Sequence, residues 1–197
     1  GQPAVESPAS STPLTLTADN QRPALTVTSI YAESVLALAL DATDWIRSFA
    51  LAAAPSATSA CVASGSRTWA WTDSNRNALV DNGDLLTLTL VNCGAPASGV
   101  VLTGSVSITL RPAPTSDALV AQLAMGPSGL SFTAGDFTFA WKGQLRVERS
   151  VSSAQDRLAA QAVATDGLKV ELRGAGVAAN DRFEALSLSR VSDNDYQ

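Results

Sequence analysis

The chain has 197 residues, of which 46% are hydrophobic and only 16% are charged, and its formal net charge is -5. This length suits a single domain, and the composition is typical of a folded, β-rich protein. Lys142 and Lys169 are its only lysines and it has no histidine, so we expect no nucleic-acid partner and no hydrolase or zinc site that depends on histidine.

The first 23 residues, "GQPAVESPASSTPLTLTADNQRP", are rich in Pro, Ser and Thr. Such a composition is typical of a tether that separates an exported or lipid-anchored domain from its anchor, or of an ordinary frayed terminus. We therefore predict a leader over residues 1–23 and a single β-rich domain over residues 24–197.

Two elements are predicted at the start of this domain. Ala24–Ile30, "ALTVTSI", reads as a short strand, and Tyr31–Ala54 reads as a helix rich in Ala and Leu that stops before Pro55. Within this helix "VLALAL" alternates with period two, so a strand is the alternative there.

The segment Tyr31–Ala54 is long enough to span a bilayer, but it carries Glu33, Asp41, Asp44 and Arg47. Charged side chains are rare in membrane-spanning helices. We therefore expect no transmembrane segment.

From Cys61 onward, short alternating runs are separated by Gly, Pro, Asn and Asp, which is typical of consecutive antiparallel strands. The pair Asp166-Gly167 predicts a hairpin. The predicted strands are residues 61–72, 84–93, 99–111, 117–125, 136–149, 156–165, 167–174 and 182–190.

Several of these strands have one apolar face, which we assign to the core. The predicted fold class is mainly β: an antiparallel meander of about eight strands, forming a curved sheet or half-barrel, with one N-terminal apolar helix packed on it. The residues assigned to the core are Val106, Ile108, Leu110, Phe137, Phe139, Trp141, Leu168, Val170 and Leu172.

Cys61 and Cys93 are the only cysteines. A hairpin register centred on the polar tip between Asp73 and Asp81 would place them directly opposite each other, close enough for a disulfide. A disulfide implies an oxidising compartment, which agrees with the tether-like leader; two reduced, buried thiols are the alternative.

In this register Trp69 and Trp71 share the face of the disulfide, while Leu86, Leu88 and Leu90 lie on the other face. One β-bulge near the loop would exchange the faces, so the core side of this hairpin stays open. We interpret the two tryptophans as packing residues, with a sugar- or lipid-contacting platform as the alternative.

The loop "DSNRNALVDNGD" matches the oxygen positions of an EF-hand calcium loop, which supplies ligands at alternate places. Ala78 replaces the glycine of the sharp turn, and Asp84 replaces the bidentate glutamate, so calcium would bind weakly. The alternative is a polar corner whose Asp and Asn side chains bond their own backbone. The candidate ligands are Asp73, Asn75, Asn77, Leu79 through its carbonyl, Asp81 and Asp84.

The segment from Cys61 to Leu110 resembles a pattern in uncharacterised exported proteins and lipoproteins of proteobacteria. In that pattern a Cys-Gly strand, an Asp/Asn loop closed by Gly-Asp, and a second strand ending in Asn-Cys are followed by a Gly-containing strand. The resemblance implies a location in the periplasm or on the outer membrane as an anchored lipoprotein, and it implies no activity.

Three functions compete. The first is a non-catalytic extracytoplasmic protein with an envelope protein partner, since no nucleophile and base pair can be written. The second is a carrier of a hydrophobic or lipid ligand in a cavity between sheet and helix. The third is an enzyme with paired carboxylates, which we disfavour because the candidates lie in or beside predicted strands, where charged side chains mostly mark the solvated face; these are Asp136, Glu148, Glu171 and Glu184.

Overall fold

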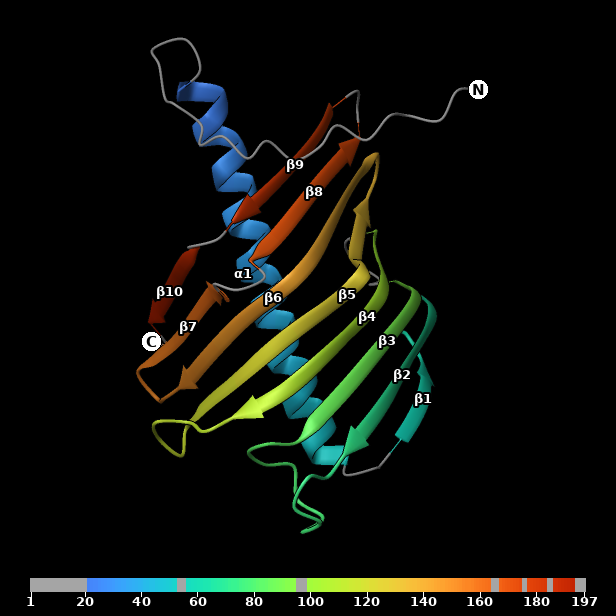
Figure 1. Ribbon diagram of the computed structural model, residues 1–197, viewed down its shortest axis with the longest axis vertical. Coiled ribbons are helices and arrows are strands. Elements are labelled where there is room, and N and C mark those ends of the chain that lie inside the picture. Colours follow the sequence, from blue (N-terminus) through green and yellow to red (C-terminus); the bar gives the residue numbers. More distant parts are fainter. Residues whose placement is uncertain are drawn as a thin grey trace.

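The structure is a computed structural model that describes residues 21–52, 56–94, 99–163, 167–174, 177–183 and 186–193. It consists of one helix lying across one face of an antiparallel sheet (Figure 1). The leader predicted over residues 1–23 lies outside the described residues up to residue 20.

Helix α1 is the single element Gln21–Ala52. Its buried side chains recur every three or four residues, which is the period of a helix packed on one side, so the predicted helix is confirmed over "VLALAL". These buried residues are Tyr31, Val35, Leu38, Ala39, Ala42, Ile46 and Phe49.

The strand predicted over Ala24–Ile30 is wrong, because these residues form the first turns of α1. Their β-branched side chains reduce helix propensity by only a few tenths of a kcal/mol each, and continuing one helix avoids starting a separate element. Pro23 lies in the first turn of the helix, where no intrahelical amide donor is needed.

Within the described part of the chain, no helix is apolar over a sufficient length to cross a membrane.

In the part of the chain that the structure describes, the sheet contains ten strands, compared with about eight expected. They are β1 (Ser56–Ala60), β2 (Ser64–Thr72), β3 (Leu85–Gly94), β4 (Val100–Arg111), β5 (Ala118–Ala134), β6 (Phe137–Val151), β7 (Gln155–Ala162), β8 (Leu168–Gly174), β9 (Val177–Phe183) and β10 (Ser187–Asp193).

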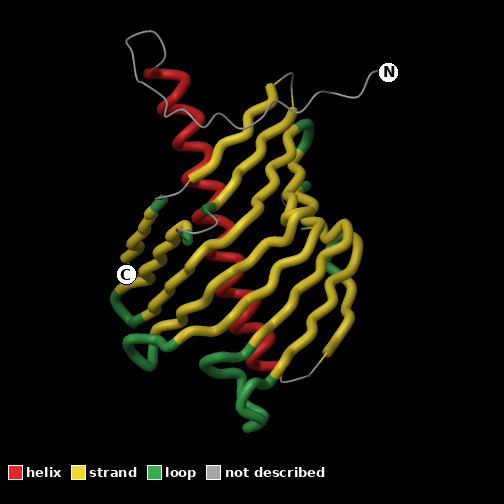
Figure 2. Tube along the Cα trace, viewed as in Figure 1, coloured by secondary structure: helices red, strands yellow, loops and turns green. Residues whose placement is uncertain are grey.

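The strands follow the order β1-β2-β3-β4-β5-β6-β7-β10, with β8 paired to β6 and β9 paired to β8. All pairs are antiparallel, and the described strands do not close into a barrel (Figure 2). The predicted mainly β fold with one helix on a curved, open sheet is therefore confirmed.

The hairpin predicted at Asp166-Gly167 is wrong, because β7 and β8 do not pair with each other. Both pair with β6, β7 along residues 145–151 and β8 along residues 138–143. Gly143, with a φ of 94°, stands where β6 changes partner. A strand of 15 residues is long enough to serve two neighbours in succession, which a local turn signal does not reveal; residues 164–166 lie outside the described part of the chain.

A line of backbone irregularities crosses the middle strands. The β4–β5 register shifts just after Gly104, and the β5–β6 register shifts between Met125 and Leu130. A Cβ added to Gly104 would lie 2.4 Å from the carbonyl oxygen of Gly129, so only glycine fits there. Bulges of this kind bend a sheet, and Figure 1 shows β5 changing direction near its upper end.

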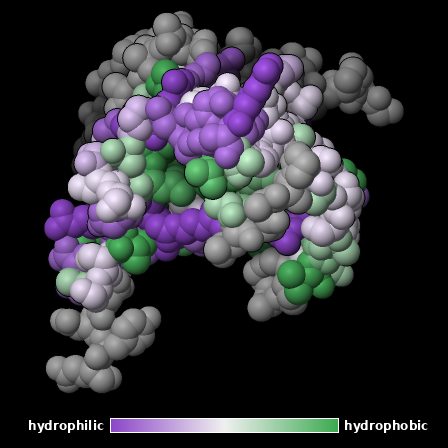
Figure 3. Space-filling view, turned by 90° about the horizontal axis from the view of Figure 1, so that it is seen from below, coloured by the Kyte–Doolittle hydropathy of each residue, from purple (hydrophilic) through white to green (hydrophobic). Residues whose placement is uncertain are grey.

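The core lies between α1 and the sheet. It includes all three predicted core residues of β4 and all three of β8, whereas Phe137 is 41% exposed at the end of β6. At the end of the molecule seen in Figure 3, hydrophobic side chains gather in a hollow bordered by hydrophilic ones.

Candidate functional site

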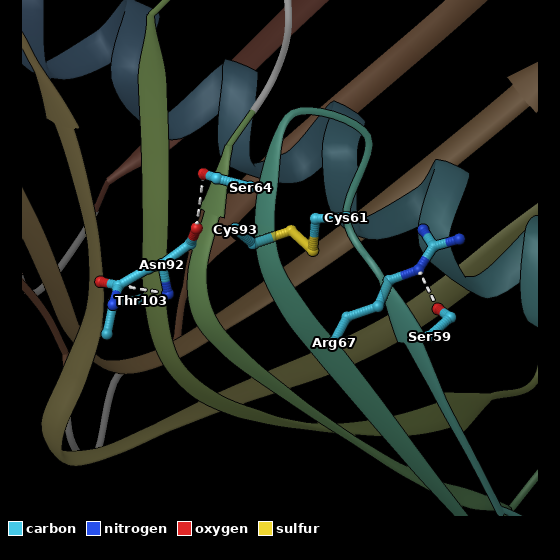
Figure 4. The surroundings of a disulfide bond; sticks show 7 residues. All are labelled: Ser59, Cys61, Ser64, Arg67, Asn92, Cys93 and Thr103. Carbon is cyan, nitrogen blue, oxygen red and sulfur yellow. Dashed lines mark hydrogen bonds between the residues drawn. A yellow bond between two sulfur atoms is a disulfide. The ribbon is translucent and has the colours of Figure 1, made fainter.

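The disulfide between Cys61 and Cys93 is present, with 5.3 Å between the two Cα atoms (Figure 4). The predicted pairing is therefore confirmed, but the register that suggested it is wrong. Trp69 lies opposite Leu88, whereas the register centred between Asp73 and Asp81 would place it opposite Leu85.

Cys61 lies in the turn between β1 and β2, not within a strand opposite Cys93. The turn is held by hydrogen bonds from the amide of Cys61 to Gly65 and from the amide of Ala63 to Gly94. A bulge at Asn92, with a φ of 48°, shifts the end of β3 so that Cys93 meets this turn. The disulfide therefore fastens a turn to a bulged strand.

The shifted register decides the core side of the hairpin. Trp69 and Trp71 lie opposite Leu88 and Leu86, and all four side chains point towards α1. The ring centroids of Trp69 and Phe49 are 5.3 Å apart. The two tryptophans are therefore packing residues, as predicted, but on the face of the leucines.

The loop between β2 and β3 is organised around the carboxylate of Asp73. This carboxylate accepts hydrogen bonds from the amides of Arg76 at 2.6 Å, Ala78 at 2.7 Å and Asn77 at 3.3 Å. Desolvation would raise the pKa of Asp73, but the amide hydrogen bonds outweigh it and hold that pKa below its usual value.

Asp84 closes the loop from inside and is fully buried. Its Oδ2 accepts the indole N–H of Trp71 at 2.9 Å and the amide of Asp81 at 3.2 Å, and its Oδ1 accepts the amide of Ser74 at 2.9 Å. Asp81 in turn accepts the side-chain amides of Asn75 and Asn77.

In this arrangement the carboxylates of the loop accept hydrogen bonds from donors of the protein itself. Leu79 and the other candidate ligands do lie in one loop, but both oxygens of Asp84 are engaged by donors of the protein. Among the described residues, no three Asp, Glu or Cys side chains are placed so that they could hold a metal ion together. Calcium would have to replace the amide donors around Asp81 and Asp84.

A cleft of about 470 Å³ lies between α1 and the strands β4, β5 and β6. It lies between the sheet and the helix, which is where the carrier function considered above requires a cavity. Its lining consists of Ile30, Glu33, Ser34, Ala37, Leu38, Asp41 and Trp45 from α1, and Val100, Leu102, Phe132, Phe139 and Trp141 from the sheet.

The wall formed by the sheet is aromatic. The ring of Phe132 lies 5.3 Å from Phe139 and 5.8 Å from Trp141, in the latter case stacked. Every lining residue of the sheet lies beyond the backbone irregularities, before Gly104 in β4 and before Gly143 in β6. The bend of the sheet therefore separates these strands from α1.

The wall formed by α1 carries two carboxylates, Glu33 and Asp41. Ser34 is satisfied within the helix, because its hydroxyl donates to the carbonyl of Tyr31 at 2.8 Å. Burial among the atoms of the cleft raises the pKa of the Asp41 carboxyl to about 6, and the carboxylate of Asp44 adds to this rise. Asp41 as a whole residue is exposed to solvent, so the cleft desolvates its carboxyl only from one side.

Two of the carboxylates considered for glycoside hydrolysis lie beside basic residues. Glu171 binds Lys142 at 2.7 Å, and Glu148 lies 3.8 Å from Arg146. Asp136 is an exposed turn residue, and Glu184 lies outside the described residues.

Sequence reasoning did not single out the helix wall of the cleft. Its residues were read only as an apolar helix with charges that oppose a membrane span. The available signal was the spacing of Glu33, Ala37 and Asp41, which places two carboxylates and a small residue on one side of a helix.

No protein-family model, curated protein or solved structure gives a significant match to this chain. The disulfide, the loop and the cleft are the features of this chain that bear on its function.

Proposed function

We propose that this protein is a non-catalytic, extracytoplasmic protein that binds a hydrophobic ligand in the cleft between α1 and the sheet. The observation that carries this proposal is the cleft itself, with its aromatic wall from Phe132, Phe139 and Trp141. Its volume of about 470 Å³ falls within the usual range of small-molecule sites.

The disulfide suggests a protein outside the cytoplasm, where such bonds persist. We propose the periplasm or the outer membrane, with the Pro/Ser/Thr-rich leader as a tether to a lipid anchor. The resemblance to exported proteins and lipoproteins supports this location. A protein of the envelope would then deliver or receive the ligand.

The proposal is non-catalytic because the chain lacks histidine, and because Glu171 and Glu148 lie beside basic residues of the sheet and not in the cleft. A carboxylate engaged by a neighbouring cation is a poor general acid at neutral pH.

Binding of a neutral solvatochromic dye such as Nile red tests the proposal. Ala37 is exposed on α1 and lines the cleft, so Ala37→Trp should fill the cleft and abolish the fluorescence increase. Ser48→Trp is the matched control, because Ser48 is exposed on the same helix but does not line the cleft. Equal dye binding by Ala37→Trp and the wild type would overturn the proposal.

Calcium binding by residues 73–84 is a separate proposal, supported by the spacing of their oxygen atoms. Millimolar calcium, but not magnesium, should raise the melting temperature of EDTA-treated protein. At one hundred times the dissociation constant, calcium should raise the free energy of unfolding by about 2.7 kcal/mol. Asp73→Ala should remove that gain. A melt that calcium does not move would leave the loop as a corner closed by its own hydrogen bonds.

A further inference from the structure

The two carboxylates in the cleft point to the chemistry of its ligand. Resting on the proposed function, we propose that the ligand is a hydrophobic cation, an amphiphile with an amine or quaternary ammonium group. The cation lies beside Glu33 and Asp41, and the apolar part lies against the aromatic wall of the sheet.

The charge of the cleft has one sign. Glu33 and Asp41 are the charged residues among those described as lining it, and neither Lys nor Arg is in that lining. Among the described residues, neither carboxylate has a salt-bridge partner. Arg149, which reaches α1 from β6, is engaged by other carboxylates, because it binds Asp44 and Asp156.

The spacing of the carboxylates leaves room for a cation between them. Glu33 and Asp41 are eight residues apart on α1, which corresponds to about 12 Å along the helix axis. Ala37 lies halfway between them and presents only a methyl group to the cleft. An ammonium group at Ala37 would therefore be flanked by a carboxylate on either side.

The aromatic residues suit the same ligand. Trp45 lies on the helix wall one turn beyond Asp41, and Trp141 lies on the sheet wall. The faces of Trp side chains attract ammonium groups within about 6 Å of the ring centroid, and quaternary ammonium ligands are recognised in this way. An anionic amphiphile would meet only repulsion from the two carboxylates.

The titration of Asp41 is consistent with this geometry. Its carboxyl has a pKa of about 6 because its charged form is poorly solvated in the cleft. A cation bound beside it would supply the missing stabilisation of that charged form.

Three amphiphiles with the same twelve-carbon chain test the inference by calorimetry at pH 7.5, each below its micelle concentration: dodecyltrimethylammonium, dodecyl maltoside and dodecyl sulfate. We expect the cation to bind at least about tenfold more tightly than the sulfate. The carboxylates and aromatic rings attract the ammonium group, the carboxylates repel the sulfate group, and both effects widen the difference in affinity. Circular dichroism at the same ligand concentrations verifies that the protein stays folded.

Variants separate the charge from the cavity. Glu33→Gln and Asp41→Asn should each weaken binding of the cation by about threefold to tenfold and leave the neutral ligand unchanged. Glu148→Gln is the matched control, because it removes a carboxylate from the opposite face of the sheet. Ala37→Trp should abolish binding of all three amphiphiles.

The outcomes distinguish the two proposals. The charge inference would be overturned if the neutral and cationic ligands bound with equal affinity and neither Glu33→Gln nor Asp41→Asn changed that affinity. The proposal of a hydrophobic-ligand site would be unaffected by this result. Binding of the cation by Ala37→Trp with wild-type affinity would also overturn it, since the site would lie elsewhere on the acidic surface. Binding of none of the three would overturn the proposed function.

Discussion

The indole nitrogen of Trp71 donates a hydrogen bond of 2.9 Å to the carboxylate of Asp84 at the base of the loop. Asp84 is fully buried and binds two backbone amides in addition. This one side chain joins β2, the loop and the first residues of β3, so its loss should be felt beyond the loop.

We predict that Asp84→Ala lowers the free energy of unfolding by about 2–4 kcal/mol, because three partly buried donors lose a charged, fully buried acceptor. Asp84→Asn keeps the size of the side chain and should cost less. Urea unfolding followed by tryptophan fluorescence measures both values. A loss below about 0.5 kcal/mol for Asp84→Ala would show that water replaces the carboxylate at no cost.

The disulfide gives the second prediction. The double variant Cys61→Ala and Cys93→Ala should be less stable by about 3–4 kcal/mol, because the cross-link closes a loop of 32 residues in the unfolded chain. Reduced wild-type protein is the matched comparison, since it keeps both side chains. Identical melting temperatures for oxidised and reduced protein would contradict this expectation.

Arg149 fastens α1 to the sheet. Its guanidinium binds Asp156 of β7 through two hydrogen bonds of 2.7 and 3.0 Å and binds Asp44 of α1 at 2.5 Å. The two partners differ in exposure, because the side chain of Asp156 is 19% exposed and that of Asp44 is 55% exposed. Solvent therefore screens only the second pair strongly.

Asp156→Asn should therefore destabilise the protein by about 1–3 kcal/mol and Asp44→Asn by less than about 0.5 kcal/mol. Hydrogen bonding to Arg149 lowers the pKa of Asp156, so its contribution is present above the ordinary pKa of an Asp and is lost as the pH falls through the lowered value. Unfolding at pH 7 and pH 2.5 tests this order. Equal losses for the two variants at pH 7 would argue against it.

Ala78 has a φ of 61°, a left-handed conformation that costs an L-residue about 1–2 kcal/mol. Ala78→Gly should relieve this cost and raise the stability by about 0.5–1 kcal/mol, in spite of the greater entropy of the unfolded chain. Ala70→Gly, in the exposed side of β2, is the control and should be destabilising. Thermal unfolding of both variants checks the difference in sign.

The carboxyl of Asp41 should titrate near pH 6, which carbon-detected NMR can follow. Because this pKa lies above the value of 3.8 of an ordinary Asp, the folded state binds the proton more tightly. The contribution of Asp41 to stability is therefore full below about pH 4 and is lost as the pH rises through 6.

The charges around Asp41 are Glu33 and Asp44 on α1 and Arg149 of β6, which binds Asp44, whereas the cleft residues of β4, β5 and β6 are uncharged. Asp41→Asn should therefore flatten the pH dependence of stability between pH 4 and 7 without affecting the rest of the curve. An unchanged pH dependence in this variant would place the titration in another group.

The fold was largely predictable because its signals are local. The helical period of α1 and the two-residue period of β4 and β8 each follow from packing on one side. β1 was not predicted because "SATSA" is polar and fully exposed at an edge, and β9 was not predicted because its Asn180-Asp181 pair resembles a turn.

The register and the site were harder to predict. The positions of Cys61 and Cys93 suggested the right disulfide through a wrong register, because the bulge at Asn92 is invisible in the sequence pattern. The cleft depends on side chains of α1 and of three strands that come together only in the folded chain, so the spacing of Glu33, Ala37 and Asp41 could indicate its helix wall but not its sheet wall.

The bend of the sheet at Gly104 and Gly143 also has a consequence for how this protein can change. The cleft lies on one side of this bend, and its lining combines buried core residues with residues at the surface. Leu38 and Trp141 line the cleft and belong to the core, whereas Ala37 lines it and is exposed. Replacing Ala37 should therefore retune ligand preference in a scaffold that folds as before, whereas replacing Trp141 would also disturb the core.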